Sequence, residues 1–108
     1  MYEQIRSVSA SKALLRSGTT VEVEVAYEVY GPSELRIEAV TRGFRSECEP
    51  VPLRAGIHRC YAPVRIVREP GVRTNTCLLR VTIGSATSSL SVSVMRRPTT
   101  FGGLPAVG

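Results

Sequence analysis

Apolar and polar residues alternate along most of this chain, which is the pattern of a β-strand with one buried face. The clearest run covers residues 20–30, where valines and Tyr27 occupy one face and Glu22, Glu24 and Glu28 the other. A period of two over this length predicts a half-buried strand. Gly31-Pro32-Ser33 follows directly and predicts a turn.

Seven such runs are separated by turn signals along the chain. The predicted strands cover residues 4–10, 20–30, 34–41, 44–53, 57–67, 74–83 and 89–94. The fourth contains Pro50 and Pro52, which a central strand does not tolerate, so we expect an edge strand or loop there. Residues 11–16 have room for a single helical turn, which Gly18 would end. The serine face of residues 89–94 makes this last strand a candidate sheet edge for another chain.

The strand rhythm predicts an all-β fold, a sandwich of about seven antiparallel strands with Greek-key connections, and a small barrel is the alternative. We expect the sandwich in residues 1–97 and an irregular tail in residues 98–108. The pattern GTTVEVEVAYEV…ELRIEAVTRG…VPLRAGIHRCYAPVRI…NTCLLRVTIG…SLSVSVMRR resembles immunoglobulin-like modules of the fibronectin type III and CARDB kind. Tryptophan is absent, unlike in antibody domains. Such sandwiches serve as adhesion modules, spacers and decorations of viral shells, so the resemblance implies a fold and leaves the function open.

Candidate catalytic and metal-binding residues are sparse. His58 is the only histidine, Asp is absent, and the Glu row of residues 22–28 lies on an outward strand face. A hydrolytic triad needs a nucleophile, a base and an orienting acid, and calcium sites need Asp-rich loops. Cys48, Cys60 and Cys77 with His58 would make up a zinc ligand set, but no paired ligand motif supports it. We therefore expect no enzyme activity, no cofactor, no metal and no small-molecule substrate.

The three cysteines are expected to be reduced and buried, as in most cytosolic proteins. Cys60 and Cys77 both fall on inward strand phases, so a Cys60–Cys77 disulfide is the first alternative, and a Cys48–Cys60 bond closing a hairpin is the second. One cysteine is left over in either case.

The charge is concentrated in two residue types and one half of the chain. Thirteen of the fourteen cations are Arg, all nine acids are Glu, and Asn and Gln occur once each. This composition fits selection for heat resistance, and a GC-rich genome explains it equally well. Residues 1–34 carry three cations and five Glu, and residues 35–108 eleven Arg and four Glu. The basic half suits nucleic acid or an acidic protein surface, although the spacing of the arginines favours solvated strand faces.

The tail after residue 97 carries Phe101, Leu104 and Val107 at three-residue steps. We expect these to anchor the tail on another subunit, with Arg96 and Arg97 pairing with a partner's carboxylates. Pro98 and Pro105 lower the entropy cost of such docking. The alternative is that the tail folds back over its own sandwich.

These features together predict a non-enzymatic structural protein that docks on a larger particle, as a decoration or minor capsid protein of a virus or phage. The N-terminus lacks a basic stretch followed by an apolar run, so we expect synthesis in the cytoplasm without a signal peptide and a final location in the virion. No run reaches the length that crosses a bilayer. The alternatives are a cell-surface or extracellular adhesion module, with Tyr30, Phe44 and Tyr61 as contact residues, and a nucleic-acid-binding domain that uses the basic half.

Overall fold

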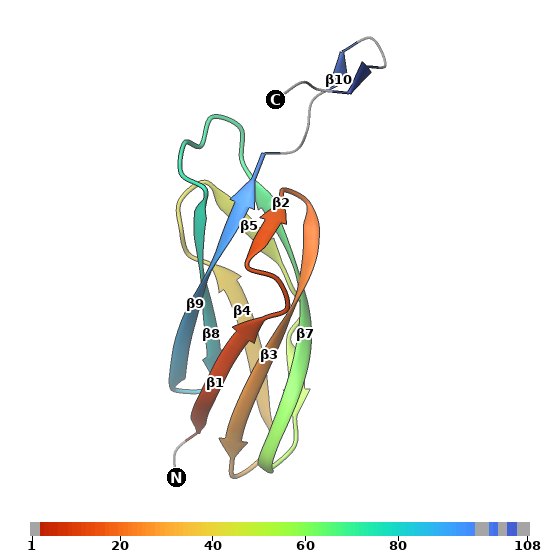
Figure 1. Cartoon of the computed structure of the whole chain (residues 1–108). Helices are drawn as coiled ribbons and strands as arrows, with labels where there is room; N and C mark the ends of the chain where they lie inside the picture. The colour runs from red at the N-terminus through yellow and green to blue at the C-terminus, as the bar shows by residue number, and fades with distance from the viewer. Residues whose placement is uncertain (1–2, 97–99, 102–103, 106–108) are drawn as a thin grey trace.

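The computed structural model describes residues 3–96, 100–101 and 104–105, and their secondary structure consists of eleven β-strands (Figure 1). In chain order these are β1 (Gln4–Ala10), β2 (Leu14–Arg16), β3 (Thr19–Val29), β4 (Ser33–Ala39), β5 (Phe44–Glu47), β6 (Val51–Leu53), β7 (Gly56–Arg68), β8 (Thr76–Ile83), β9 (Ala86–Met95), β10 (Thr100–Phe101) and β11 (Leu104–Pro105). The all-β prediction is confirmed.

Nine of these strands form two sheets. The four-stranded sheet has the order β1-β3-β7-β5 and is antiparallel throughout. The five-stranded sheet has the order β2-β9-β8-β4-β6, and it is mixed because β2 runs parallel to β9. The remaining two strands, β10 and β11, pair with each other in a short hairpin, so the tail is not irregular throughout.

The prediction of about seven antiparallel strands is wrong in its count, because one run is divided between the two sheets and one strand forms outside the seven runs. The fourth run starts as β5 beside β7 and continues as β6 beside β4. The additional strand is β2, which follows the first run and lies parallel to β9 in the five-stranded sheet. The prediction of the fourth run as edge structure is confirmed, since β5 and β6 each form the edge of a sheet.

The helical turn considered for residues 11–16 does not form. Strand pairing prevails there because Leu15 is buried in the core, and the Ala13 carbonyl accepts a hydrogen bond from the Ser93 amide at 2.8 Å. The expectation that the last strand lies at a sheet edge holds only for part of it. β2 pairs with Ser93–Met95 at the end of β9, whereas no described strand pairs with residues 86–92 on that side.

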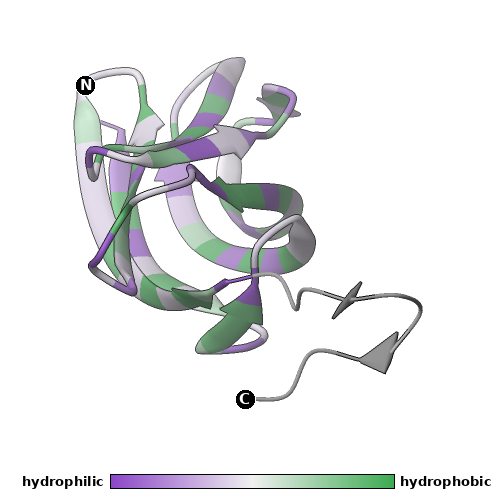
Figure 2. Cartoon of the chain, turned by 90° about the horizontal axis from the view of Figure 1, so that it is seen from above, coloured by the Kyte–Doolittle hydropathy of each residue, from purple (hydrophilic) through white to green (hydrophobic). Residues whose placement is uncertain are grey.

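The core lies between the sheets and is built from the predicted inward rows. Viewed from above, the strands are striped with alternating hydropathy around this interior (Figure 2). The twelve largest fully buried side chains of the described residues are Leu35, Ile66, Leu79, Ile83, Val21, Val23, Val25, Val29, Val64, Val81, Val92 and Val94. Burying one such side chain stabilises a fold by about 1.5–3 kcal/mol, so the burial of these inward rows provides most of the driving force for folding.

Candidate functional site

One end of the sandwich is formed by the loops that surround the exit of the tail from β9 (Figure 1). We call residues 16–18, 40–43, 68–75 and 94–96 the tail-bearing end. Backbone hydrogen bonds join its segments: Ser17 N–H to the Met95 carbonyl at 2.8 Å, Glu69 N–H to the Gly43 carbonyl at 2.8 Å, and Val94 N–H to the Asn75 carbonyl at 2.7 Å. These bonds make the tail-bearing end a connected surface.

A buried arginine holds this end together from the inside. Arg68 is the last residue of β7 and belongs to the inward-pointing row of that strand; it is 9 % exposed. Nη1 donates to Oδ1 of Asn75 at 2.5 Å and to the Val94 carbonyl at 3.2 Å, and Nη2 donates to the Val72 carbonyl at 2.5 Å. The Arg68 amide also donates to Oγ of Ser17 at 2.8 Å. One residue therefore connects both sheets and the β7–β8 loop.

The Arg68 charge has only neutral partners. Its acceptors are carbonyl oxygens, it belongs to none of the ion pairs among the described residues, and its Nε has no hydrogen-bond partner there. A guanidinium stays charged in proteins. The interior of the tail-bearing end is therefore electropositive.

The surface of the same end is also basic. Its exposed cations are Arg16, Arg42, Arg73 and Arg96. In the part of the chain that the structure describes, all six ion pairs involve other arginines, which lie on strands β1, β4, β5, β7 and β8. Glu69 is the one carboxylate within residues 68–75, and the other segments of this end contain none. The paired arginines lie on strands, as expected, whereas four of the exposed arginines without an ion pair among the described residues lie at the tail-bearing end and Arg54 lies at the opposite end.

A small apolar patch adjoins this basic surface. Leu15, Leu79 and Val94 point into the core, so the neighbouring Leu14, Leu78 and Met95 point outward from the five-stranded sheet. These three are 63 %, 37 % and 39 % exposed. Leu14 lies opposite Ser93 and Leu78 opposite Ser91, so serines of β9 separate the two leucines and the three apolar side chains are spread over β2, β9 and β8. Exposed apolar side chains beside cations suit a protein-binding surface.

The tail residues predicted to bind a partner are only partly described. Arg96 is exposed at the end of β9, and Phe101 pairs with Leu104 across the β10–β11 hairpin. Arg97 and Val107 lie outside the described residues, and tail docking stays a prediction. The sequence analysis missed Arg68, although residue 68 continues the inward phase of residues 60–66.

The cysteines and His58 occupy structural positions. All three cysteines are free thiols in the structure, so the Cys60–Cys77 disulfide is not formed. Burial raises the pKa of the Cys77 thiol to about 11, and it also raises the pKa of Cys48 and Cys60. Nε2 of His58 donates to the Ala55 carbonyl at 3.0 Å. Among the described residues, no three potential metal ligands lie together.

Comparison of the sequence with models of known protein families gives no match, and comparison with curated proteins gives none either. Within residues 3–96 and the tail hairpin, no helix has the length and hydrophobicity to cross a membrane.

Proposed function

We infer that the fold is immunoglobulin-like. Such domains place strands A, B, E and D in one sheet and strands G, F and C in the other, with C′ added beside C in variable-type domains. The orders β1-β3-β7-β5 and β9-β8-β4-β6 fit these two series. Two features depart from the pattern: β5 precedes β6 in the chain, and β2 extends the sheet beyond β9.

We propose that the protein is a non-enzymatic structural subunit that docks on a larger protein assembly through its tail-bearing end. We assign the protein to a virus or phage particle, as a decoration or minor capsid protein. The observation that carries the proposal is the clustering of four exposed arginines around the exit of the tail, none of which forms an ion pair within the described part of the chain. The apolar patch of Leu14, Leu78 and Met95 adds desolvation energy beside them.

The charge arrangement supports an acidic protein surface as the partner. Arginine pairs with carboxylates through two parallel hydrogen bonds, which gives orientation as well as attraction. On the sheet faces these bonds are already used internally, for example between Arg59 and Glu24 at 2.7 Å and between Arg6 and Glu28 at 2.6 Å. At the tail-bearing end the exposed guanidinium groups of Arg16, Arg42, Arg73 and Arg96 form no ion pair with the described residues, so they are available for a partner.

The test measures molar mass by size-exclusion chromatography with light scattering for residues 1–108 and 1–97. We expect a tail-dependent assembly for the full chain and a monomer for the shorter one. Arg73→Glu should weaken the assembly, whereas Arg54→Glu should not, because Arg54 is an exposed, unpaired arginine at the opposite end. Monomers for both lengths, with no binding to a particle, would contradict the proposal.

The basic tail-bearing end also favours nucleic acid as a second candidate partner. That function predicts retention on heparin and a binding constant that falls linearly with salt on logarithmic axes. Adhesion has less support, because Phe44 is buried, which removes it from the predicted contact aromatics. Tyr30 and Tyr61 remain exposed, and binding to a glycan array would favour that alternative.

A further inference from the structure

Residues 44–53 leave the four-stranded sheet after β5, so part of β7 has no neighbouring strand on that side. β5 pairs only with residues Arg65–Arg68 of β7, and after Glu47 the chain crosses to β6 in the other sheet. On this side, no described strand pairs with residues 56–64 of β7. Half of the backbone N–H and C=O groups of this stretch therefore face an open edge, because these groups alternate between the two sides of a strand.

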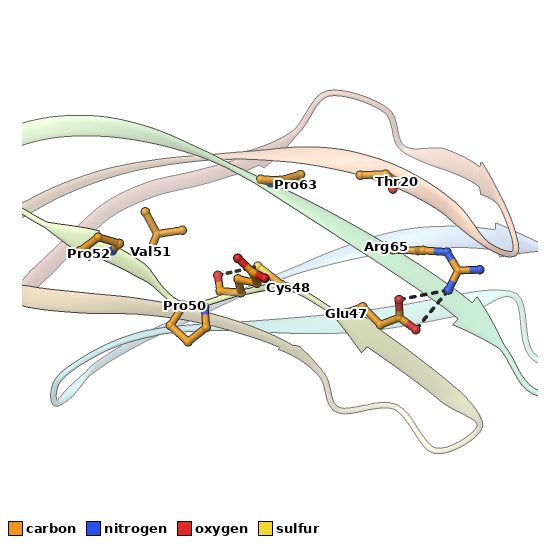
Figure 3. A pocket seen from close by; sticks show the side chains of 9 residues that line it. Thr20, Glu47, Cys48, Pro50, Val51, Pro52, Pro63 and Arg65 are labelled. Carbon is orange, nitrogen blue, oxygen red and sulfur yellow. Dashed lines mark hydrogen bonds and ion pairs between the residues drawn. The ribbon is translucent and has the colours of Figure 1, made fainter.

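A groove lies where β5 would have continued beside β7. Its volume is about 530 Å³, and three prolines, Pro50, Pro52 and Pro63, line it together with Val51 and Cys48 (Figure 3). The close-up shows Pro63 on β7 across the groove from the crossing segment. We call this site the β7 groove. Thr20, Glu47, Glu49 and Arg65 also line it, and Arg65 pairs with Glu47 at 3.1 Å. The apolar part of the lining suits an uncharged segment.

The open edge carries exposed apolar side chains and little protection against pairing. Ile57 and Tyr61 are 64 % and 56 % exposed and point to the outer face of the sheet. Edge strands are usually guarded by Lys, Pro or inward-pointing charges. Along residues 56–64, Pro63 is the only proline and there is no lysine, while the charge of Arg59 is paired with Glu24. The edge is therefore suited to accept an added strand.

We propose that the β7 groove and its open edge bind the C-terminal tail of a second copy of this chain. This inference rests on the proposed function and names the surface that receives the tail. An added strand would supply hydrogen-bond partners for the open edge, which is the mode of β-augmentation. It would lie beside residues 56–64 of β7, on the side where β5 pairs with Arg65–Arg68.

The tail has the chemistry that the groove requires. Residues 98–108 contain no charged side chain, so docking them against prolines and Val51 strands no charge. Thr100–Phe101 and Leu104–Pro105 already have strand conformation in the β10–β11 hairpin. The twelve residues after Arg96 span at most about 40 Å when extended, which is enough to reach a neighbouring copy.

The two surfaces lie at different places on one molecule, and this determines the kind of assembly. The tail leaves the end of β9, whereas the groove opens along the side of β7. A contact between different surfaces of identical copies closes into a dimer when two copies exchange their tails reciprocally, and otherwise produces rings or filaments. In each case the assembly is expected to depend on protein concentration.

The test compares Tyr61→Glu and Val51→Arg with the matched control Tyr30→Glu in light-scattering measurements on the full chain. Tyr30 is 53 % exposed, close to the 56 % of Tyr61, but it follows β3, which lies on the other side of β7 from the open edge. We expect at least tenfold weaker assembly for the first two variants and wild-type assembly for the control. Circular dichroism verifies that each variant is folded.

Crosslinking distinguishes the copies. Cys48 lines the groove, so a benzophenone maleimide is attached to it in a Cys60→Ser, Cys77→Ala chain, which is mixed with a ¹⁵N-labelled copy and irradiated. Crosslinks from Cys48 to the tail peptide of the other isotope support the inference. Crosslinks confined to one isotope show that the groove holds its own tail and overturn it. A tail-dependent assembly that survives both groove variants overturns the inference while leaving the proposed function standing, and monomers throughout count against both.

Discussion

The buried Arg68 predicts a measurable coupling with Asn75, the only asparagine in the chain. Asn75→Ala removes the Oδ1 acceptor that lies 2.5 Å from Nη1 of Arg68. Hydrogen bonds to charged groups contribute about 1.5–3 kcal/mol. The Nε of Arg68 already lacks a partner, so the guanidinium has no spare acceptor to compensate. We therefore expect Asn75→Ala to lower the free energy of unfolding by about 2 kcal/mol.

A double-mutant cycle isolates this interaction. Arg68→Met removes the guanidinium and with it the need for the Oδ1 acceptor, so Asn75→Ala should cost less than about 0.5 kcal/mol in that background. The expected coupling energy is then roughly 1.5–2 kcal/mol. Urea unfolding with linear extrapolation measures all four proteins, and equal m-values show that each unfolds from the same fold. Equal costs of Asn75→Ala in both backgrounds would refute the reasoning.

Two further predictions concern stability. Gly43 has φ +92°, and an added Cβ would collide with Cγ2 of Val72, so Gly43→Ala should destabilise by roughly 2–4 kcal/mol. Gly71→Ala is the matched control: φ is +85° there but the space is open, so its smaller cost measures backbone strain alone, and equal costs would disprove the collision. The folded-state pKa of Cys77, about 11, lies above its unfolded value near 9. The unfolded chain therefore loses this proton first, and stability should fall by about 1.4 kcal/mol per pH unit from pH 9 to 11. Cys77→Val should abolish that part of the fall in urea titrations at pH 8 and 10.5, and an unchanged slope would show that Cys77 is not its source.

The inward rows of the core were predictable because alternation reports directly which side chains face the interior. Val21, Leu35 and Leu79 were all placed correctly on this basis. The sheet to which a strand belongs was not predictable in this way. Both sheets face the same core, so a segment that crosses between them, such as residues 44–53, keeps its alternation. Seven runs became nine strands in two sheets because this run forms β5 and β6, and because β2 forms from residues 14–16, outside the runs.

The tail-bearing end was not predictable because its parts are far apart in the chain. Arg16, Arg42, Arg73 and Arg96 come from four separate connections, and only the directions of the strands bring them to one end. Arg68 is a different case. Its inward position was predictable from the alternation, but a charged residue at the end of an alternating run is normally taken as the end of the strand. Its acceptors Val72 and Val94 lie in other segments of the chain.

The central claim, that the tail-bearing end docks on another protein molecule, is tested most directly by hydrogen exchange of the tail amides. Mass spectrometry of the peptide covering residues 97–108 would follow exchange at low and high protein concentration. The account predicts that protection of these amides rises with concentration, because the tail is held by a neighbouring molecule. Protection that is the same at all concentrations, with the tail held by its own domain, would contradict it.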